Sequence, residues 1–175
     1  IGGWQDQVQW YENHGNGLVN STHLLLTSTS AQFASFASTD LDNDGNLDVV
    51  CFSGTTALAI LARPGGPLVH TSVIAEQGPT ILLADLQGDG EPEFVGSSLN
   101  IIRALAYDTS SHTFQTVLSA GAATGKHFVA DIDGDGKDEI WRYANVGFWI
   151  WSVDAAWNVT QTAFLANALS DEIMP

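Results

Sequence analysis

The stretch Asp40-Leu-Asp42-Asn-Asp44-Gly45-Asn-Leu-Asp48 places four carboxylates and a glycine within nine residues. Similar stretches, here called acidic loops, recur as Asp85-Leu-Gln87-Gly-Asp89-Gly90-Glu-Pro-Glu93 and Asp131-Ile-Asp133-Gly-Asp135-Gly136-Lys-Asp138-Glu139. Their first aspartates are 45 and then 46 residues apart. Repetition at a fixed period of this size is typical of repeat architectures. The loop and its period therefore decide the predicted fold.

Each acidic loop is accompanied by four short apolar stretches, one before it and three from its end onward. The first loop has residues 33–37, 47–52, 57–62 and 68–74; the second has 80–84, 93–96, 101–107 and 114–118; the third has 127–130, 139–143, 148–153 and 159–165. These stretches are rich in β-branched and aromatic residues and are bounded by turn formers, which indicates strands. The pattern predicts an all-β fold, a β-propeller built from four-stranded antiparallel blades of about 45 residues.

The predicted domain organisation is a single repeat domain over residues 1–175. It comprises a partial blade at 1–30, blades at 31–76, 77–120 and 121–165, and a tail or closing strand at 166–175. In the partial blade, residues 8–12 and 23–27 read as strands and residues 13–20 as the turn between them. A first strand and a fourth acidic loop are missing before Ile1. We therefore expect three whole blades plus a partial one, as a piece of a larger repeat assembly.

The charge of the chain points to cations as ligands. Its net charge is −15 with only five Lys and Arg, which argues against nucleic acid as a partner. The acidic loops hold 13 of the 20 Asp and Glu residues. No apolar run reaches 18 residues, so no membrane insertion is expected. The one cysteine, Cys51, lies in an apolar strand and reads as an inert buried thiol.

Within each loop, alternate side chains can turn towards one centre, and calcium takes six to eight hard oxygen ligands in flexible geometry. Glycine at position 6 permits the sharp bend. Position 7 offers a backbone carbonyl, whereas the side chain of Asp138, at position 8, is expected to point away. The second loop carries neutral Gln87 and should bind more weakly. The predicted calcium ligands are Asp40, Asp42, Asp44, Asn46 (carbonyl) and Asp48; Asp85, Gln87, Asp89, Glu91 (carbonyl) and Glu93; and Asp131, Asp133, Asp135, Lys137 (carbonyl) and Glu139.

Two other interpretations of the loops are weaker. Solvated carboxylates in Asx-type turns would explain a single loop, but three copies in register favour calcium. Magnesium prefers fewer protein ligands and more water.

The pattern Asp-x-Asp-x-Asp-Gly-x-x-Asp/Glu between short strands resembles the FG-GAP/VCBS-type repeats. The stretch Trp10-Tyr-Glu-Asn13 is similar to a segment that such repeats carry. The literal Phe-Gly and Gly-Ala-Pro signatures are absent. The resemblance implies a β-propeller like those of integrin α-subunit heads and fungal lectins, with calcium in the loops and an extracellular adhesive or scaffolding role.

The sequence thus predicts a secreted or cell-surface calcium-binding module with a structural or adhesive role. Its partner would be a protein or glycan outside the cell, or further copies of itself. Two alternatives remain open: a carbohydrate-binding lectin, and a self-assembling subunit of an extracellular filament. An enzyme is not expected, because no nucleophile elbow and no histidine pair with zinc spacing occurs. The sequons at Asn20 and Asn158 are predicted glycosylation sites of a secreted glycoprotein.

Overall fold

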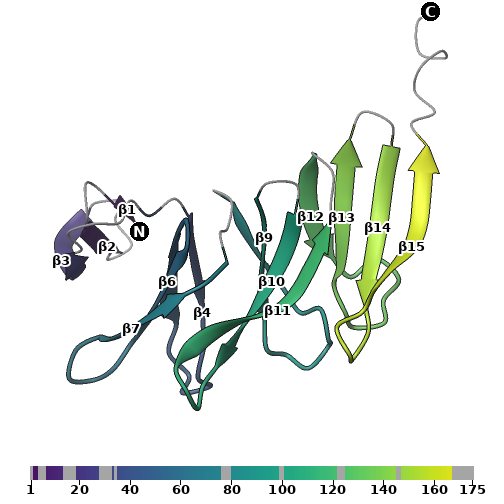
Figure 1. Ribbon diagram of the computed structural model, residues 1–175. Coiled ribbons are helices and arrows are strands. Elements are labelled where there is room, and N and C mark those ends of the chain that lie inside the picture. Colours follow the sequence, from purple (N-terminus) through teal and green to yellow (C-terminus); the bar gives the residue numbers. More distant parts are fainter. Residues whose placement is uncertain are drawn as a thin grey trace, which may run out of the picture. The chain divides into compact units, whose positions relative to one another are not determined.

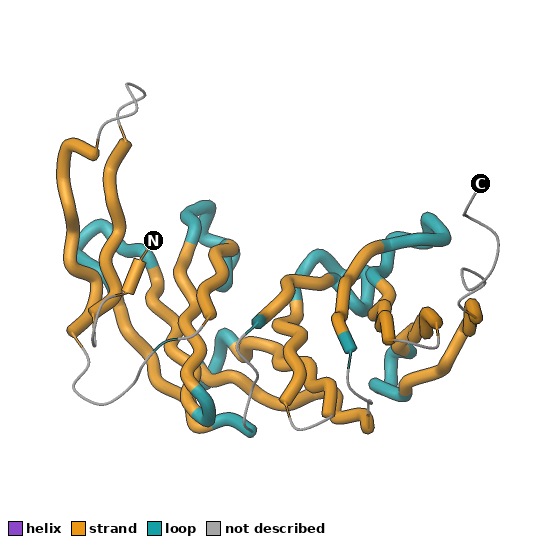
Figure 2. Tube along the Cα trace, turned by 90° about the horizontal axis from the view of Figure 1, so that it is seen from above, coloured by secondary structure: helices purple, strands orange, loops and turns teal. Residues whose placement is uncertain are grey.

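Strands and loops make up the part of the chain that the structure describes. The computed structural model describes residues 2–3, 7–13, 19–27, 33, 35–75, 80–98, 101–121, 125–144 and 147–166. Figure 2 shows strands in orange and loops in teal, and no helix occurs among these residues. Accordingly, no described segment is a helix with the length and apolar character needed to cross a membrane.

Three sheets each contain four strands that follow one another in chain order (Figure 1). Antiparallel neighbours joined by short turns give this meander order. The predicted all-β fold and its four-stranded antiparallel units are thereby confirmed, whereas closure into a propeller ring stays a prediction. The three sheets are β4 (Ser35–Thr39), β5 (Asp48–Ser53), β6 (Thr56–Leu61) and β7 (Leu68–Val73); β8 (Ile81–Ala84), β9 (Glu93–Ser98), β10 (Ile101–Asp108) and β11 (Thr113–Gly121); and β12 (Lys126–Ala130), β13 (Glu139–Ala144), β14 (Gly147–Val153) and β15 (Val159–Ala166).

The N-terminal part forms a three-stranded sheet, β1 (Gly2–Gly3), β2 (Gln7–Asn13) and β3 (Val19–Thr27). β3 begins earlier than the sequence predicted: Val19 pairs with Asn13 at the end of β2, and Asn20 lies at the β-bulge between Val19 and Ser21. The β-branched Val19 favours this extension. At the other end, Ala166 closes β15, and residues 167–175 of the predicted tail lie outside the described residues.

The chain divides into two compact units, residues 1–81 with 107–114 and residues 82–106 with 115–175. In the first unit, β6 pairs with β5 on one side and β7 on the other. Residues 57–61 of β6 are all at most 5% exposed. A strand covered on both faces reads as a continuous apolar run, which explains the sequence Ala57-Leu-Ala-Ile-Leu61.

The three-stranded sheet packs on this core through Val8, which clusters with Cys51, Leu58 and Ile60. Cys51 is fully buried, and burial raises the pKa of its thiol to about 12. A thiol with so high a pKa is not ionised near neutral pH and is unreactive. The structure therefore supports the prediction of an inert buried cysteine.

Successive sheets in the first unit are also joined by two buried serines. The backbone N–H of Ile81 donates to Ser35 Oγ at 3.1 Å, and that of Phe114 donates to Ser72 Oγ at 3.0 Å. Each bond satisfies an N–H that would otherwise be buried without a partner, which is costly.

The second unit has its own core, which extends into the second acidic loop. Leu86, at loop position 2, is fully buried and clusters with Val95, Ile102 and Ile140. The loop is therefore anchored from within by an apolar side chain as well as by its hydrogen bonds.

The paired residues Leu61 and Leu68 test this description of the core, since they face each other across β6 and β7. Leu61 is fully buried, and Leu68 is 45% exposed. We expect Leu61→Ala to lower the free energy of unfolding by about 2–5 kcal/mol, through lost burial and a residual cavity. The control Leu68→Ala should cost less than about 1 kcal/mol. Urea denaturation measures both, and equal losses would contradict the assigned burial.

Candidate metal centre

The acidic loops connect the first and second strands of each sheet, as predicted, and their ninth position opens the second strand. Asp48, Glu93 and Glu139 at this position are 0%, 4% and 4% exposed. Each accepts a hydrogen bond from the backbone N–H of loop position 2, at 2.9, 3.0 and 3.1 Å. This bond ties the two ends of the loop together.

Burial has an electrostatic consequence for these three carboxyls. It raises the pKa of Asp48 and Glu139, and it raises that of Glu93 to about 7. The cause is desolvation, which disfavours the charged form. A buried carboxylate is stable as an anion when a cation lies beside it. Each ninth position is therefore suited to a cation.

Two further hydrogen bonds fold every loop in the same way. The aspartate at position 1 accepts the N–H of the position-6 glycine at 2.8, 2.9 and 3.0 Å in the three loops. The aspartate at position 5 accepts the N–H of position 7 at 2.8, 2.9 and 2.9 Å. These are Asx-type turns. They are compatible with metal binding, because each carboxylate has about four lone-pair sites and keeps some of them for a cation.

Two backbone positions in each loop adopt the left-handed region. The glycine at position 6 was predicted to do so, and its φ is 87°, 83° and 88° in the three loops. Position 4 does so as well, with φ of 56° at Asn43, 72° at Gly88 and 79° at Gly134. The left-handed conformation at position 4 was not predicted from the sequence. Its signal is the choice of Asn, Gly and Gly, the residue types that best tolerate positive φ.

Two loops gather carboxylates into groups that could hold a metal ion. In the first loop, Asp40, Asp42 and Asp48 place one oxygen each within 4.8 Å of one another. In the third loop, Asp131, Asp133 and Glu139 do the same. Both groups consist of positions 1, 3 and 9 and offer the hard oxygen donors that calcium prefers. The position-5 residues Asp44 and Asp135 are not part of these groups.

The second loop forms no such group among the described residues, because Gln87 replaces a carboxylate at position 3. Its amide Nε2 donates to the backbone carbonyl of Asp154 at 3.2 Å. Ligation by Asp85, Gln87, Asp89 and Glu93 therefore stays a prediction, as does ligation by the position-7 carbonyls of Asn46, Glu91 and Lys137.

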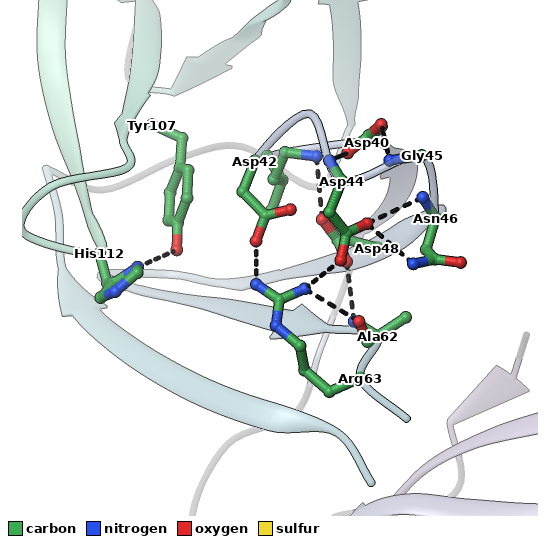
Figure 3. Close-up of polar contacts among 11 residues, drawn as sticks. Asp40, Asp42, Asp44, Gly45, Asn46, Asp48, Ala62, Arg63, Tyr107 and His112 are labelled. Carbon is green, nitrogen blue, oxygen red and sulfur yellow. Dashed lines mark hydrogen bonds and ion pairs between the residues drawn. The ribbon is translucent and has the colours of Figure 1, made fainter. Parts of the chain in front are cut away.

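The first loop also fits a cation at the level of single atoms (Figure 3). Asp42 Oδ1 is buried and has no hydrogen-bond partner, whereas Asp42 Oδ2 binds the guanidinium of Arg63. A buried carboxylate oxygen without a partner carries a desolvation cost. A cation among Asp40, Asp42 and Asp48 would remove it.

The second and third loops are joined directly. Asp138 Oδ2 accepts the N–H of Asp85 at 2.8 Å, and the N–H of Asp138 donates to the Asp85 carbonyl at 2.7 Å. Asp138 was predicted to point away from its own loop, and its partner is the first residue of the neighbouring one. The two loops also pack closely, because a Cβ added at Gly88 would lie 2.9 Å from the carbonyl oxygen of Gly136.

The two predicted glycosylation sites have different settings. Asn20 lies within β3, and its side chain is outside what the structure describes. Asn158 is exposed in the turn before β15, and its Nδ2 donates to Asp154 Oδ2 at 2.9 Å. Glycosylation of either residue stays a prediction.

Comparison with known proteins supports the resemblance noted in the sequence. Residues 1–51 match the model of the FG-GAP-like repeat family. The matched segment includes the three-stranded sheet and the whole first acidic loop. This part of the chain is thus similar to an FG-GAP-like repeat. No curated protein and no solved structure matches the chain.

The raised pKa of Glu93 predicts how the stability of the protein depends on pH when no metal ion is present. Between its ordinary value of 4.5 and about 7, the folded state binds more protons at Glu93 than the unfolded state does. The free energy of unfolding therefore falls as pH rises through this window. We expect wild type to lose on the order of 1–3 kcal/mol relative to Glu93→Gln between pH 4.5 and 8. Glutamine keeps an oxygen for the Leu86 N–H.

Urea denaturation in calcium-free buffer at several pH values measures this difference. A constant difference between wild type and Glu93→Gln across the range would show that Glu93 titrates normally.

Asp138→Ala should leave the Asp85 N–H without its acceptor. We expect a loss of about 1 kcal/mol in the free energy of unfolding and faster hydrogen exchange at the Asp85 amide. The control Asp138→Asn retains a side-chain oxygen acceptor and should protect that amide. Hydrogen exchange followed by NMR reads the site directly, and wild-type protection in Asp138→Ala would refute the contact.

Proposed function

We propose that the chain is a calcium-binding repeat module of the β-propeller type, in which calcium rigidifies the acidic loops. The observation that carries this proposal is the recurrence of one carboxylate group, from positions 1, 3 and 9, at the same place in two sheets. Chance clustering on an acidic surface does not predict the same three positions twice. Nor does it predict a buried carboxylate at position 9 of all three loops.

The donor chemistry favours calcium over other cations. The groups contain only carboxylates, whereas zinc sites use histidine and cysteine. Side-chain and backbone oxygens on one short loop suit the large, flexible coordination shell of calcium better than the strict octahedron of magnesium. The ion would offset the mutual repulsion of the carboxylates and the cost of burying position 9. Its role is structural.

We also propose that the module works outside the cell as a structural or adhesive element. Extracellular calcium modules bind with dissociation constants of about 10⁻⁴–10⁻³ M. Loops of that affinity fill where calcium is in the millimolar range. The FG-GAP-like repeat at residues 1–51 supports a propeller-type assembly of the sheets.

The test is the melting temperature with calcium and with chelator. A ligand that binds only the folded state stabilises it by about 1.4 kcal/mol per site at ten times its dissociation constant. For a chain of this size that is about 3–6 °C per site. We expect Asp133→Asn and Asp42→Asn each to reduce the calcium-induced shift, and magnesium to give little shift. Identical melting curves in 10 mM calcium and in EGTA would refute the proposal.

A further inference from the structure

The first acidic loop binds a cation from elsewhere in the chain, the guanidinium of Arg63 (Figure 3). Arg63 Nη1 donates to Asp44 Oδ2 at 2.7 Å, and Nη2 binds Asp42 Oδ2. Nη1 also donates to the carbonyl of Ala62 at 2.9 Å, which fixes the side chain against its own backbone. The planar fork of an arginine suits such contacts with two carboxylates. Arg63 thus joins loop positions 3 and 5.

The backbone around Arg63 is also tied to the loop. The N–H of Ala62 donates to Asp48 Oδ1 at 2.8 Å, so the end of β6 holds the buried ninth position. Arg63 follows directly. Its place beside the loop is therefore fixed by the bond between the preceding residue and the buried Asp48.

Strand register identifies the corresponding residue in the other two sheets. Val49, Phe94 and Ile140 each follow the ninth loop position, and they pair with Ile60, Leu105 and Trp151. Three residues further along the chain from Ile60, Arg63 follows the end of β6 in the first sheet. The other two sheets have Asp108 and Asp154 at that position.

These two aspartates engage their own hairpins. Asp108 Oδ1 accepts the N–H of Ser110 at 2.8 Å, and Asp154 Oδ1 accepts the N–H of Ala156 at 2.9 Å. The hydrogen bond from Ser110 lowers the pKa of Asp108. The pKa of Asp154 is lowered chiefly by its hydrogen bonds from Asn158. Both stay ionised. The register position is therefore positive beside the first loop and negative in the other two sheets.

The negative charge of the first loop affects the pKa of a neighbouring side chain, Tyr107. Burial raises the pKa of the Tyr107 phenol, and the carboxylates of Asp42 and Asp48 raise it further. Arg63 lowers it, but the four carboxylates of the loop outnumber this one guanidinium. A guanidinium that binds two of the loop's carboxylates reduces this repulsion without any metal.

We infer that Arg63 is a built-in counter-ion that holds the first loop folded without calcium and lowers its affinity for calcium below that of the third loop. Calcium at Asp40, Asp42 and Asp48 would lie beside the guanidinium of Arg63, which is bound to Asp42. Two neighbouring positive charges repel each other. The third loop carries the same carboxylate positions without an arginine at this register. The affinity part of the inference rests on the proposed function, whereas the calcium-free part does not.

The test follows two glycine amides by NMR during a calcium titration, Gly45 in the first loop and Gly136 in the third. In wild type, the Gly136 resonance should reach its midpoint at lower calcium than Gly45. In Arg63→Met, the Gly45 midpoint should move to about tenfold lower calcium, with Gly136 unchanged. The control Arg103→Met removes a positive charge from β10 and should leave the Gly45 midpoint in place.

The outcomes separate the two proposals. A Gly45 midpoint at or below that of Gly136 in wild type, or unchanged in Arg63→Met, would overturn the role of Arg63 while calcium binding stands. If neither resonance responds to 20 mM calcium, the proposed function fails, and the affinity part of the inference fails with it.

Melting in EGTA tests the calcium-free part separately. We expect Arg63→Met to melt about 2–4 °C below wild type, because the loop loses its counter-charge, with Arg63→Lys in between. Equal melting temperatures would overturn this part.

Discussion

The structure of each repeat depends on one carboxylate, the side chain at the ninth loop position. It is the first residue of the second strand, and it is buried in all three repeats. Its bond to the N–H of position 2 fixes where the loop begins relative to where the strand resumes. In the first loop, the same carboxylate also receives the N–H of Ala62 and so ties the third strand to the loop. In the first repeat, this one residue thus links the start of the loop, the second strand and the end of the third strand. Its buried charge is unfavourable unless a cation compensates it.

The three repeats differ in the charges around this carboxylate. The first binds a guanidinium, the second replaces a carboxylate with Gln87, and the third keeps its full set of carboxylates beside Lys137. The backbone of the loop is the same in all three, down to the left-handed residues at positions 4 and 6. Backbone geometry and charge compensation are therefore separable. The backbone geometry follows from short-range hydrogen bonds, whereas the charge compensation differs from one repeat to the next.

This separation explains what the sequence could predict. The strands and loops were predictable because their signals are local: β-formers between turn residues, and Asp and Gly at fixed offsets. Asn20 was predicted to lie in a turn because its stretch is polar and turn-prone, whereas in the structure it lies within β3, next to the paired Val19. Arg63 could not be assigned from spacing, since it reaches residues 19 and 21 positions away through strand register. The contact between Asp138 and Asp85 could not be predicted either, because the two residues lie 53 positions apart in the sequence.

The order of strands has a consequence for how the chain reaches its native state. Among the described strands, each sheet pairs neighbours in sequence. The side-chain bonds that join one sheet to the next, at Ser35, Ser72 and Asp138, each span about one repeat period. Loop-closure entropy for such contacts is small, and proteins dominated by local pairing fold quickly. A nascent chain could therefore complete each sheet as it emerges and add it to the one before, so that synthesis and assembly run in the same direction.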